Sequence, residues 1–127
     1  SDRGLPRVSP AAFRANLMEM IERARRFGTR HIILSTNHPT LRHKTLLSGE
    51  SLEERRRHYN WIMREVAAET EVTLCDIDDG FAGLDGAALE PLLLPYPDHL
   101  HLSARGHAHY AGLIYPPVAE AIRAVIA

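Results

Sequence analysis

The 127-residue chain has 45% hydrophobic and 24% charged side chains, a composition typical of one globular domain and unlike that of a disordered or fibrous protein. Its formal net charge is −1, and acidic and basic residues are interleaved along the sequence, which makes nucleic acid a poor candidate for a partner. No apolar stretch approaches the roughly 20 residues that a membrane span needs, so we expect no membrane-spanning segment. The single cysteine, Cys75, lies in an apolar run and is interpreted as a small buried hydrophobe.

Residues 9–28 carry the signals of a helix, and a strand is expected to follow them. Ser9 can cap the helix, Pro10 suits its first position and Gly28 suits its end. The apolar stripe between them has helical spacing and consists of Phe13, Leu17, Met20, Ile21 and Ala24. The short apolar run at 31–36 then predicts a strand that is buried on both faces.

Residues 51–77 repeat this order of helix and strand. Ser51 and Glu54 form a capping-box pattern at the start of a helix that continues to about position 69. The apolar run at 72–77 predicts a second buried strand. A strand, a helix and a strand in this order imply a right-handed parallel unit.

The remaining residues predict a long loop and one last helix. Positions 78–94 are interpreted as a loop with short helical turns, and prolines restrict the segment 95–101. Ser103 is expected to cap a final helix, which Pro116 and Pro117 should kink or restart. No repeat or linker divides residues 1–127, which therefore predict one α/β domain. Two parallel strands are too few for a sheet covered on both faces, so we expect the N-terminal strands to be missing from this chain.

Asp98 and His101 lie three positions apart in the turn that leads into the last helix. A modest bend there can bring the carboxylate onto Nδ1 of the imidazole. In hydrolytic triads such a carboxylate fixes the tautomer of the histidine and stabilises the imidazolium that forms during the reaction. The spacing alone is a weak signal, because such pairs occur by chance on many surface turns.

The segment 98–107, which reads Asp-His-Leu-His-Leu-Ser-Ala-Arg-Gly-His, resembles the last conserved block of the SGNH (GDSL) hydrolase family. Residues 8–28 and the run 32–36 also resemble the helix and strand that follow that family's third block. The resemblance implies a three-layer, flavodoxin-like α/β fold with a parallel sheet, of which residues 1–127 form the C-terminal part. It further implies that Asp98 is the triad acid and His101 the general base, that the substrate is a small-molecule ester, and that no cofactor is used.

The family's other catalytic groups have no counterpart in these residues. Its nucleophile lies in a Gly-Asp-Ser block, which this sequence lacks. Its oxyanion hole adds a glycine and an asparagine from later blocks; Asn37 follows the wrong strand for that role and is interpreted as a loop contact. The serines of the chain are interpreted as helix caps (Ser9, Ser51, Ser103), a strand end (Ser35) and part of a loop (Ser48). We therefore expect a missing N-terminal segment or a complementary chain to supply the nucleophile.

Other polar residues receive structural interpretations. His99 is an alternative base, although the family spacing favours His101. His107 and His109 are expected to be structural, and the histidines at positions 31, 38, 43 and 58 show no metal-binding spacing, so no metal is expected. Asp76, Asp78 and Asp79 could form a cation site, but a solvated strand end is favoured. Arg55, Arg56 and Arg57 are interpreted as a solvated helix face.

Two other classes of function compete with ester hydrolysis. The absent nucleophile supports a non-catalytic, truncated or degenerate hydrolase module that binds a partner or ligand. A receiver-like or nucleotide-binding protein is disfavoured, because no Gly-rich phosphate loop follows either strand. The sequence leaves both a cytoplasmic and a secreted location open.

Overall fold

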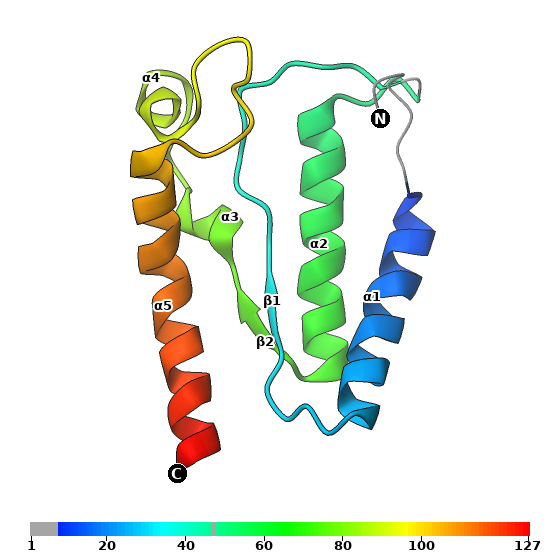
Figure 1. The fold of residues 1–127 in the computed structure, drawn as a ribbon. Helices are drawn as coiled ribbons and strands as arrows, with labels where there is room; N and C mark the ends of the chain where they lie inside the picture. Colours follow the sequence, from blue (N-terminus) through cyan, green and yellow to red (C-terminus); the bar gives the residue numbers. More distant parts are fainter. Residues whose placement is uncertain (1–7, 47) are drawn as a thin grey trace.

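Helices lie on both faces of a small parallel sheet in the computed structural model, which describes residues 8–46 and 48–127. Figure 1 shows α1 (Pro10–Arg26) and α2 (Leu52–Thr70) on one side of the strands and α5 (Ala104–Ile126) on the other. The strands are β1 (Ile33–Ser35) and β2 (Thr73–Cys75). The short elements α3 (Ile77–Gly80), α4 (Gly86–Leu89) and the 3₁₀ helix η1 (Glu90–Leu92) connect β2 to α5. The predicted α/β class with a parallel sheet is confirmed.

The three long helices begin at the predicted caps. The hydroxyl oxygens of Ser9, Ser51 and Ser103 accept hydrogen bonds from backbone N–H groups at 3.1, 3.0 and 3.2 Å. Each bond satisfies an amide that the first helical turn leaves without a partner. At the other end of the chain, α5 continues through Pro116 and Pro117 as one helix, so the helix does not restart there.

The two strands pair in parallel, with Ile33 opposite Thr73 and Ser35 opposite Cys75, and α2 is the crossover between them. In the part of the chain that the structure describes, each strand has one neighbour. All three residues of β1 are only partly buried, so the expectation of strands buried on both faces is wrong. A parallel strand is buried on both faces only when further strands and helices surround it.

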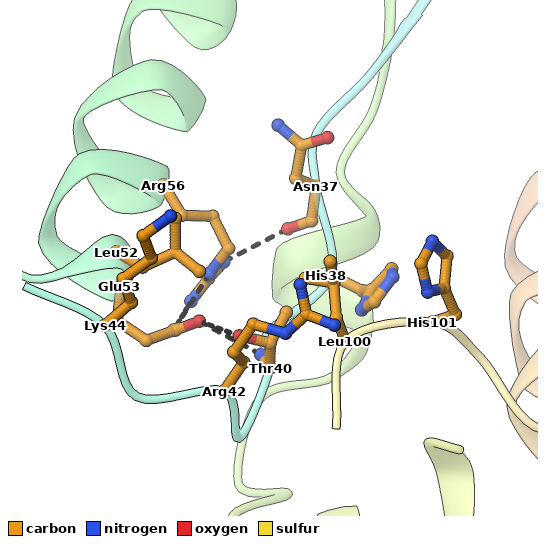
Figure 2. Close-up of a pocket in the computed structure, with 10 residues that line it drawn as sticks. All are labelled: Asn37, His38, Thr40, Arg42, Lys44, Leu52, Glu53, Arg56, Leu100 and His101. Atoms are coloured by element: carbon orange, nitrogen blue, oxygen red, sulfur yellow. Dashed lines mark hydrogen bonds and ion pairs between the residues drawn. The ribbon is translucent and has the colours of Figure 1, made fainter. Parts of the chain in front are cut away.

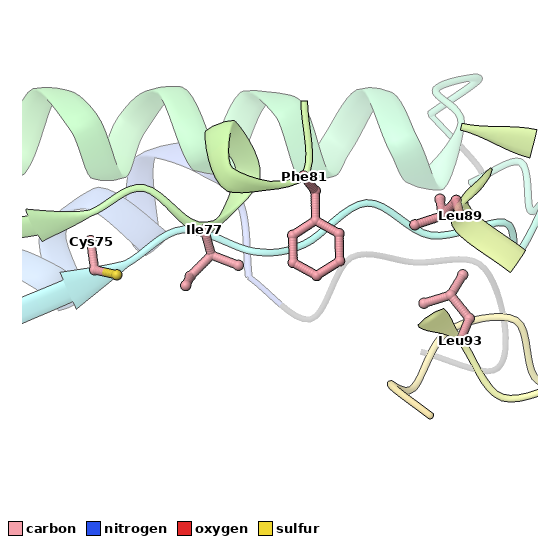
Figure 3. Close-up of a cluster of buried hydrophobic side chains, with 5 residues drawn as sticks. All are labelled: Cys75, Ile77, Phe81, Leu89 and Leu93. Carbon is pink, nitrogen blue, oxygen red and sulfur yellow. The ribbon is translucent and has the colours of Figure 1, made fainter. Parts of the chain in front are cut away.

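Each face of the sheet has its own hydrophobic cluster. Between the sheet and the pair α1 and α2, the buried residues are Leu17, Ile21, Ile62 and Val66. On the α5 side, shown in Figure 3, they are Cys75, Ile77, Phe81, Leu89 and Leu93. Leu34 packs against the first cluster and Ile33 against the second, because successive side chains of a strand point to opposite faces. The prediction that Cys75 is buried is confirmed.

The second half of α5 presents apolar side chains that the described residues do not cover. Val118, Ile122, Val125 and Ile126 are all exposed. Together with Ala121 and Ile33 they line an apolar groove of about 220 Å³ between α5 and β1. Within residues 8–46 and 48–127, no helix is long and apolar enough to cross a membrane.

The basic face predicted for residues 55–57 is solvated only at Arg57. Arg55 is buried beside Glu50, with 2.5 Å between Nε and Oε2, and only 12% of the Arg56 side chain is exposed. Arg56 is covered because the segment after β1 folds over the first turns of α2, where the carbonyl of Asn37 accepts a hydrogen bond from Arg56 at 3.1 Å. Burying an arginine requires such polar partners.

The predicted solvated cluster of aspartates is also corrected. Arg64 of α2 donates to Asp76 at 2.8 Å and to Asp78 at 2.9 Å, and Arg56 donates to the other oxygen of Asp78 at 2.7 Å. The hydrogen bonds from Arg64 hold the pKa of Asp76 below its usual value. Only Asp79 is exposed, as predicted. No group of metal-ligating side chains is found among the described residues.

Candidate active site

The loop between η1 and α5, which carries Asp98 and His101, is closed at its base by backbone hydrogen bonds. Leu94 donates to the carbonyl of His101 at 2.8 Å, and Ser103 donates to the carbonyl of Leu92 at 2.9 Å. In the first turn of α5, a Cβ atom on Gly106 would lie 1.9 Å from the carbonyl oxygen of Leu92. Glycine is therefore required for this close approach, which fixes where the loop begins and ends.

Within this loop the carboxylate of Asp98 binds both the backbone and the ring of His101. Its Oδ1 accepts hydrogen bonds from the backbone N–H groups of Leu100 at 2.9 Å and His101 at 2.7 Å, and its Oδ2 lies 2.9 Å from Nδ1 of His101. His99, between them, has a left-handed backbone with φ of 49°, which tightens the turn. The two side chains thus lie within hydrogen-bond distance, as their spacing predicts.

These contacts favour the ionised form of the Asp98 carboxyl group. The hydrogen bonds from the backbone and ring of His101, followed by that from Leu100, hold the pKa of Asp98 well below its usual range. An ionised carboxylate beside Nδ1 favours the tautomer in which Nδ1 carries the proton. The Nε2 atom of His101 is then the basic nitrogen, and 69% of this side chain is exposed.

Arg42, which the sequence did not single out, connects the segment after β1 to this loop. Its Nε donates to the backbone carbonyl of Asp98 at 2.9 Å, and its Nη2 lies 3.7 Å from Oδ2 of the same residue. Beside it, Leu41 donates through its backbone N–H to the carbonyl of His99 at 2.9 Å. The sequence could have indicated Arg42 by its place after a predicted strand. Segments that follow parallel strands gather at one edge of the sheet, where ligands bind.

A pocket of about 470 Å³ opens beside His101 (Figure 2). Asn37 and His38 come shortly after the end of β1 and line the pocket, so the pocket lies at the carboxyl end of that strand. Its remaining walls come from the segment 40–44, the first turns of α2 and the Asp98 loop. The full lining is Asn37, His38, Thr40, Arg42, Lys44, Leu52, Glu53, Arg56, Leu100 and His101. Among the described residues, no serine lines it.

Asn60 holds the first residues of the pocket wall in place. Its side chain is fully buried in α2. The amide oxygen accepts a hydrogen bond from the backbone N–H of Asn37 at 2.8 Å, and the amide nitrogen donates to the carbonyl of Asn37 at 3.0 Å. Asn37 is therefore fixed through its backbone, in agreement with the predicted loop contact. In the sequence, Asn60 could have been noticed as a polar residue next to the apolar stripe of α2.

The side chains of His99 and His109 have partners other than the carboxylate of Asp98. The ring of His99 packs edge-on against Tyr96, with centroids 5.8 Å apart, and its Nε2 lies 3.6 Å from Glu90. The geometry therefore favours His101 over His99 as the partner of Asp98. In α5, Nε2 of His109 lies 2.8 Å from the carbonyl oxygen of Gly80, which agrees with the predicted structural role.

Solved structures share this arrangement of helices and strands. LAE5, an α/β hydrolase enzyme from the metagenome of Lake Arreo, Spain, superposes with a TM-score of 0.68 at 21% identity, over 88% of this chain and 48% of its own. The lipase/acylhydrolase from Enterococcus faecalis gives 0.64 at 23% identity, over 86% of this chain and 51% of its own. The esterase domain of the zebrafish ZfL2-1 ORF1 protein superposes with a TM-score of 0.57 at 23% identity, over 97% of this chain and 63% of its own. No curated protein sequence matches the chain.

These likenesses establish an α/β fold that is also found in an α/β hydrolase and a lipase/acylhydrolase. The sequence identifies the family directly, since the model of the GDSL-like lipase/acylhydrolase family matches residues 2–109. The chain belongs to this family. It spans about half the length of the LAE5 and Enterococcus faecalis chains.

Proposed function

We propose that residues 1–127 supply the acid and base of a carboxylic ester hydrolase that uses a Ser-His-Asp triad. Asp98 is the acid and His101 the general base. The observation that carries this proposal is the 2.9 Å contact between Oδ2 of Asp98 and Nδ1 of His101, in a loop that borders a pocket at the carboxyl end of β1. Membership of the GDSL-like family supports the hydrolase class.

The proposed reaction assigns a step to each group. Nε2 of His101 accepts the proton of a serine hydroxyl while the serine oxygen bonds to the ester carbonyl carbon, and Asp98 stabilises the imidazolium. The tetrahedral oxyanion, held by hydrogen-bond donors, collapses and breaks the ester C–O bond. The departing alcohol takes the proton from His101, and water then releases the acid from the acyl-serine by the same route.

We further propose that the serine and the oxyanion-hole donors come from a segment outside residues 1–127 or from a complementary chain. These residues contain no Gly-Asp-Ser block, and the chain covers only 48–63% of the three solved relatives described above. The partly buried β1 and the apolar groove between Ile33 and the second half of α5 offer a surface that another strand could cover.

The test compares residues 1–127 alone with the complete polypeptide or complex that contains them. Hydrolysis of a short-chain nitrophenyl ester and labelling by a fluorophosphonate serine probe are measured on both. We expect residues 1–127 to show neither labelling nor hydrolysis above the background of surface histidines, and the complete enzyme to show both. Labelling within residues 1–127 would overturn the external nucleophile. An inert complete protein would favour the non-catalytic binding module.

A further inference from the structure

We propose that the pocket beside His101 binds an oxyanionic group of the substrate, a carboxylate or a phosphate, through the guanidinium of Arg42. This inference rests on the proposed function and specifies its substrate class. The hydrolysed esters would carry a negative charge in the part of the molecule that does not react.

The carboxylate that lines the pocket, Glu53, is fully engaged by neighbouring donors. Its Oε1 accepts hydrogen bonds from the backbone N–H of Thr40 at 3.1 Å and from the Thr40 hydroxyl at 2.7 Å. Its Oε2 accepts from Arg56 Nε at 2.9 Å. Arg56 neutralises this carboxylate, and it also binds Asp78 and the carbonyl of Asn37. Arg56 is therefore a structural cation that holds the wall together.

Arg42 is paired less completely. Its Nε bonds to an uncharged carbonyl, and the nearest carboxylate oxygen among the described residues, Oδ2 of Asp98, lies 3.7 Å from Nη2. That distance is beyond a normal hydrogen bond. Both oxygens of Asp98 already take part in hydrogen bonds to Leu100 and His101. Of the two arginines that line this pocket, Arg42 is thus the one whose terminal nitrogens the carboxylates of the described residues match less closely.

The position of Arg42 suits recognition of an anion next to the reacting bond. Figure 2 shows its side chain reaching from the segment after β1 toward the side of the pocket where Leu100 and His101 lie. Its side chain is 38% exposed, so it is partly shielded from water. Guanidinium groups bind carboxylates and phosphates through two parallel hydrogen bonds, which fixes the orientation of the bound group. Lys44 lines the same wall and adds positive charge there.

The first experiment measures anion binding without any reaction. The complete enzyme is titrated with inorganic phosphate, with glutarate and with neutral glutaramide, and backbone amide NMR shifts at 37–44 and 98–101 report binding. We expect phosphate, glutarate or both to bind, and neutral glutaramide not to bind. The Arg42→Gln variant should raise the dissociation constant about tenfold or more, the scale of one lost charge-assisted interaction. Arg42→Lys should recover part of the affinity, because it keeps the charge.

Matched variants keep this experiment interpretable. Arg123→Gln removes one positive charge from the last turn of α5, so it should leave anion binding unchanged. Lys44→Gln should weaken binding less than Arg42→Gln and serves as a second variant if the latter does not fold. A folded Arg42→Gln variant with the anion affinity of the wild type would overturn the proposal, whatever the effect of Lys44→Gln.

The second experiment uses the complete enzyme and a matched pair of substrates. Mono-4-nitrophenyl glutarate carries a terminal carboxylate, whereas 4-nitrophenyl valerate has the same acyl length without the charge. The ratio of their kcat/KM values should fall about tenfold in Arg42→Gln, and taking the ratio cancels any general loss caused by the contact between Arg42 and Asp98. A ratio unchanged by Arg42→Gln overturns the anionic substrate. If no ester is hydrolysed but anions still bind through Arg42, the proposed function fails and the anion site stands.

Discussion

Asp76 and Asp98 are two acidic residues with lowered pKa values and different partners. Asp76 binds the guanidinium of Arg64, with contacts of 2.8 and 3.0 Å. Asp98 binds backbone N–H groups and the imidazole of His101. A guanidinium keeps its proton at every working pH, whereas an imidazole gains or loses one near neutrality. The charge of the first pair is therefore fixed, whereas the second pair has the groups that the proton transfer proposed above requires.

The surroundings of the two residues strengthen this contrast. Asp76 also accepts a hydrogen bond from the hydroxyl of Thr36 at 2.7 Å, so it joins the ends of both strands to α2. The Asp98 loop instead leaves the His101 ring largely exposed beside a pocket. The comparison indicates that a carboxylate at this edge is a candidate for chemistry when its partner is titratable and accessible.

The largest expected effect is that of removing the titratable partner. In the complete enzyme, His101→Ala should lower kcat by about 10⁴ to 10⁶, the scale observed when a triad base is lost. The measurement is steady-state hydrolysis of a short-chain nitrophenyl ester. His99→Ala is the matched control, since the His99 ring packs on Tyr96 away from the carboxylate, and it should cost far less. Equal activity of wild type and His101→Ala would remove the triad from this protein.

The next effect is that of removing the carboxylate while the base remains. Asp98→Ala should lower kcat by about 10⁴, somewhat less than the loss of the histidine, because a misoriented imidazole can still act occasionally. The same ester assay measures it, and circular dichroism checks that the loop substitution leaves the fold intact. A folded Asp98→Ala enzyme with wild-type kcat would show that His101 works without an acid.

A smaller effect is expected when the ion pair between Arg64 and Asp76 is broken, and it should appear in the free energy of unfolding instead of the rate of hydrolysis. Arg64→Gln leaves Asp76 without its cation, while Asp78 keeps Arg56. The three side chains are 23–35% exposed, so we expect a loss of about 1–2 kcal/mol in unfolding free energy, between the values of surface and buried pairs. Urea unfolding measures it, with kcat/KM unchanged.

The control for this pair is Arg23→Gln, which removes an exposed ion pair with Glu19 on α1. It should cost only about 0.3–0.5 kcal/mol. A loss as small as this in Arg64→Gln would contradict the structural role assigned to the network around Asp76.

Local signals were sufficient for much of the fold. A cap such as Ser51 bonds to an amide three positions along the chain, and Asp98 and His101 are equally close in sequence, so spacing alone could bring them together. The apolar periodicity of each helix is likewise a local property.

Contacts between distant segments could not be read in this way. Arg42 and Asp98 are 56 positions apart, and their contact exists only because both segments reach the carboxyl edge of the sheet. The burial of Arg56 depends on the segment after β1 folding over α2, and Arg55 is buried beside Glu50. Three consecutive arginines on a helix indicate a solvated face unless that tertiary contact is known, which is why the sequence prediction failed there.

The smallest expected effect is a pH dependence of stability that separates Asp98 from Asp76. The pKa of Asp98 is held well below the value of about 3.9 that an aspartate has in an unfolded chain. Its ionised form therefore stabilises the fold above about pH 4, and this contribution is lost as the pH falls toward the folded pKa. Asp98→Asn should be less stable than the wild type at pH 6, and the two unfolding curves should converge as the pH falls below 4.

Asp76→Asn should behave in the same direction, because the pKa of Asp76 is also lowered, in its case mainly by Arg64. Urea midpoints at pH 6, 5, 4 and 3 measure both effects, and in Arg64→Gln the pH dependence due to Asp76 should shrink while that due to Asp98 persists. Parallel curves for wild type and Asp98→Asn across this range would mean that the hydrogen bonds to the Asp98 carboxylate do not favour its ionised form, and the distinction drawn between the two residues would lose its electrostatic basis.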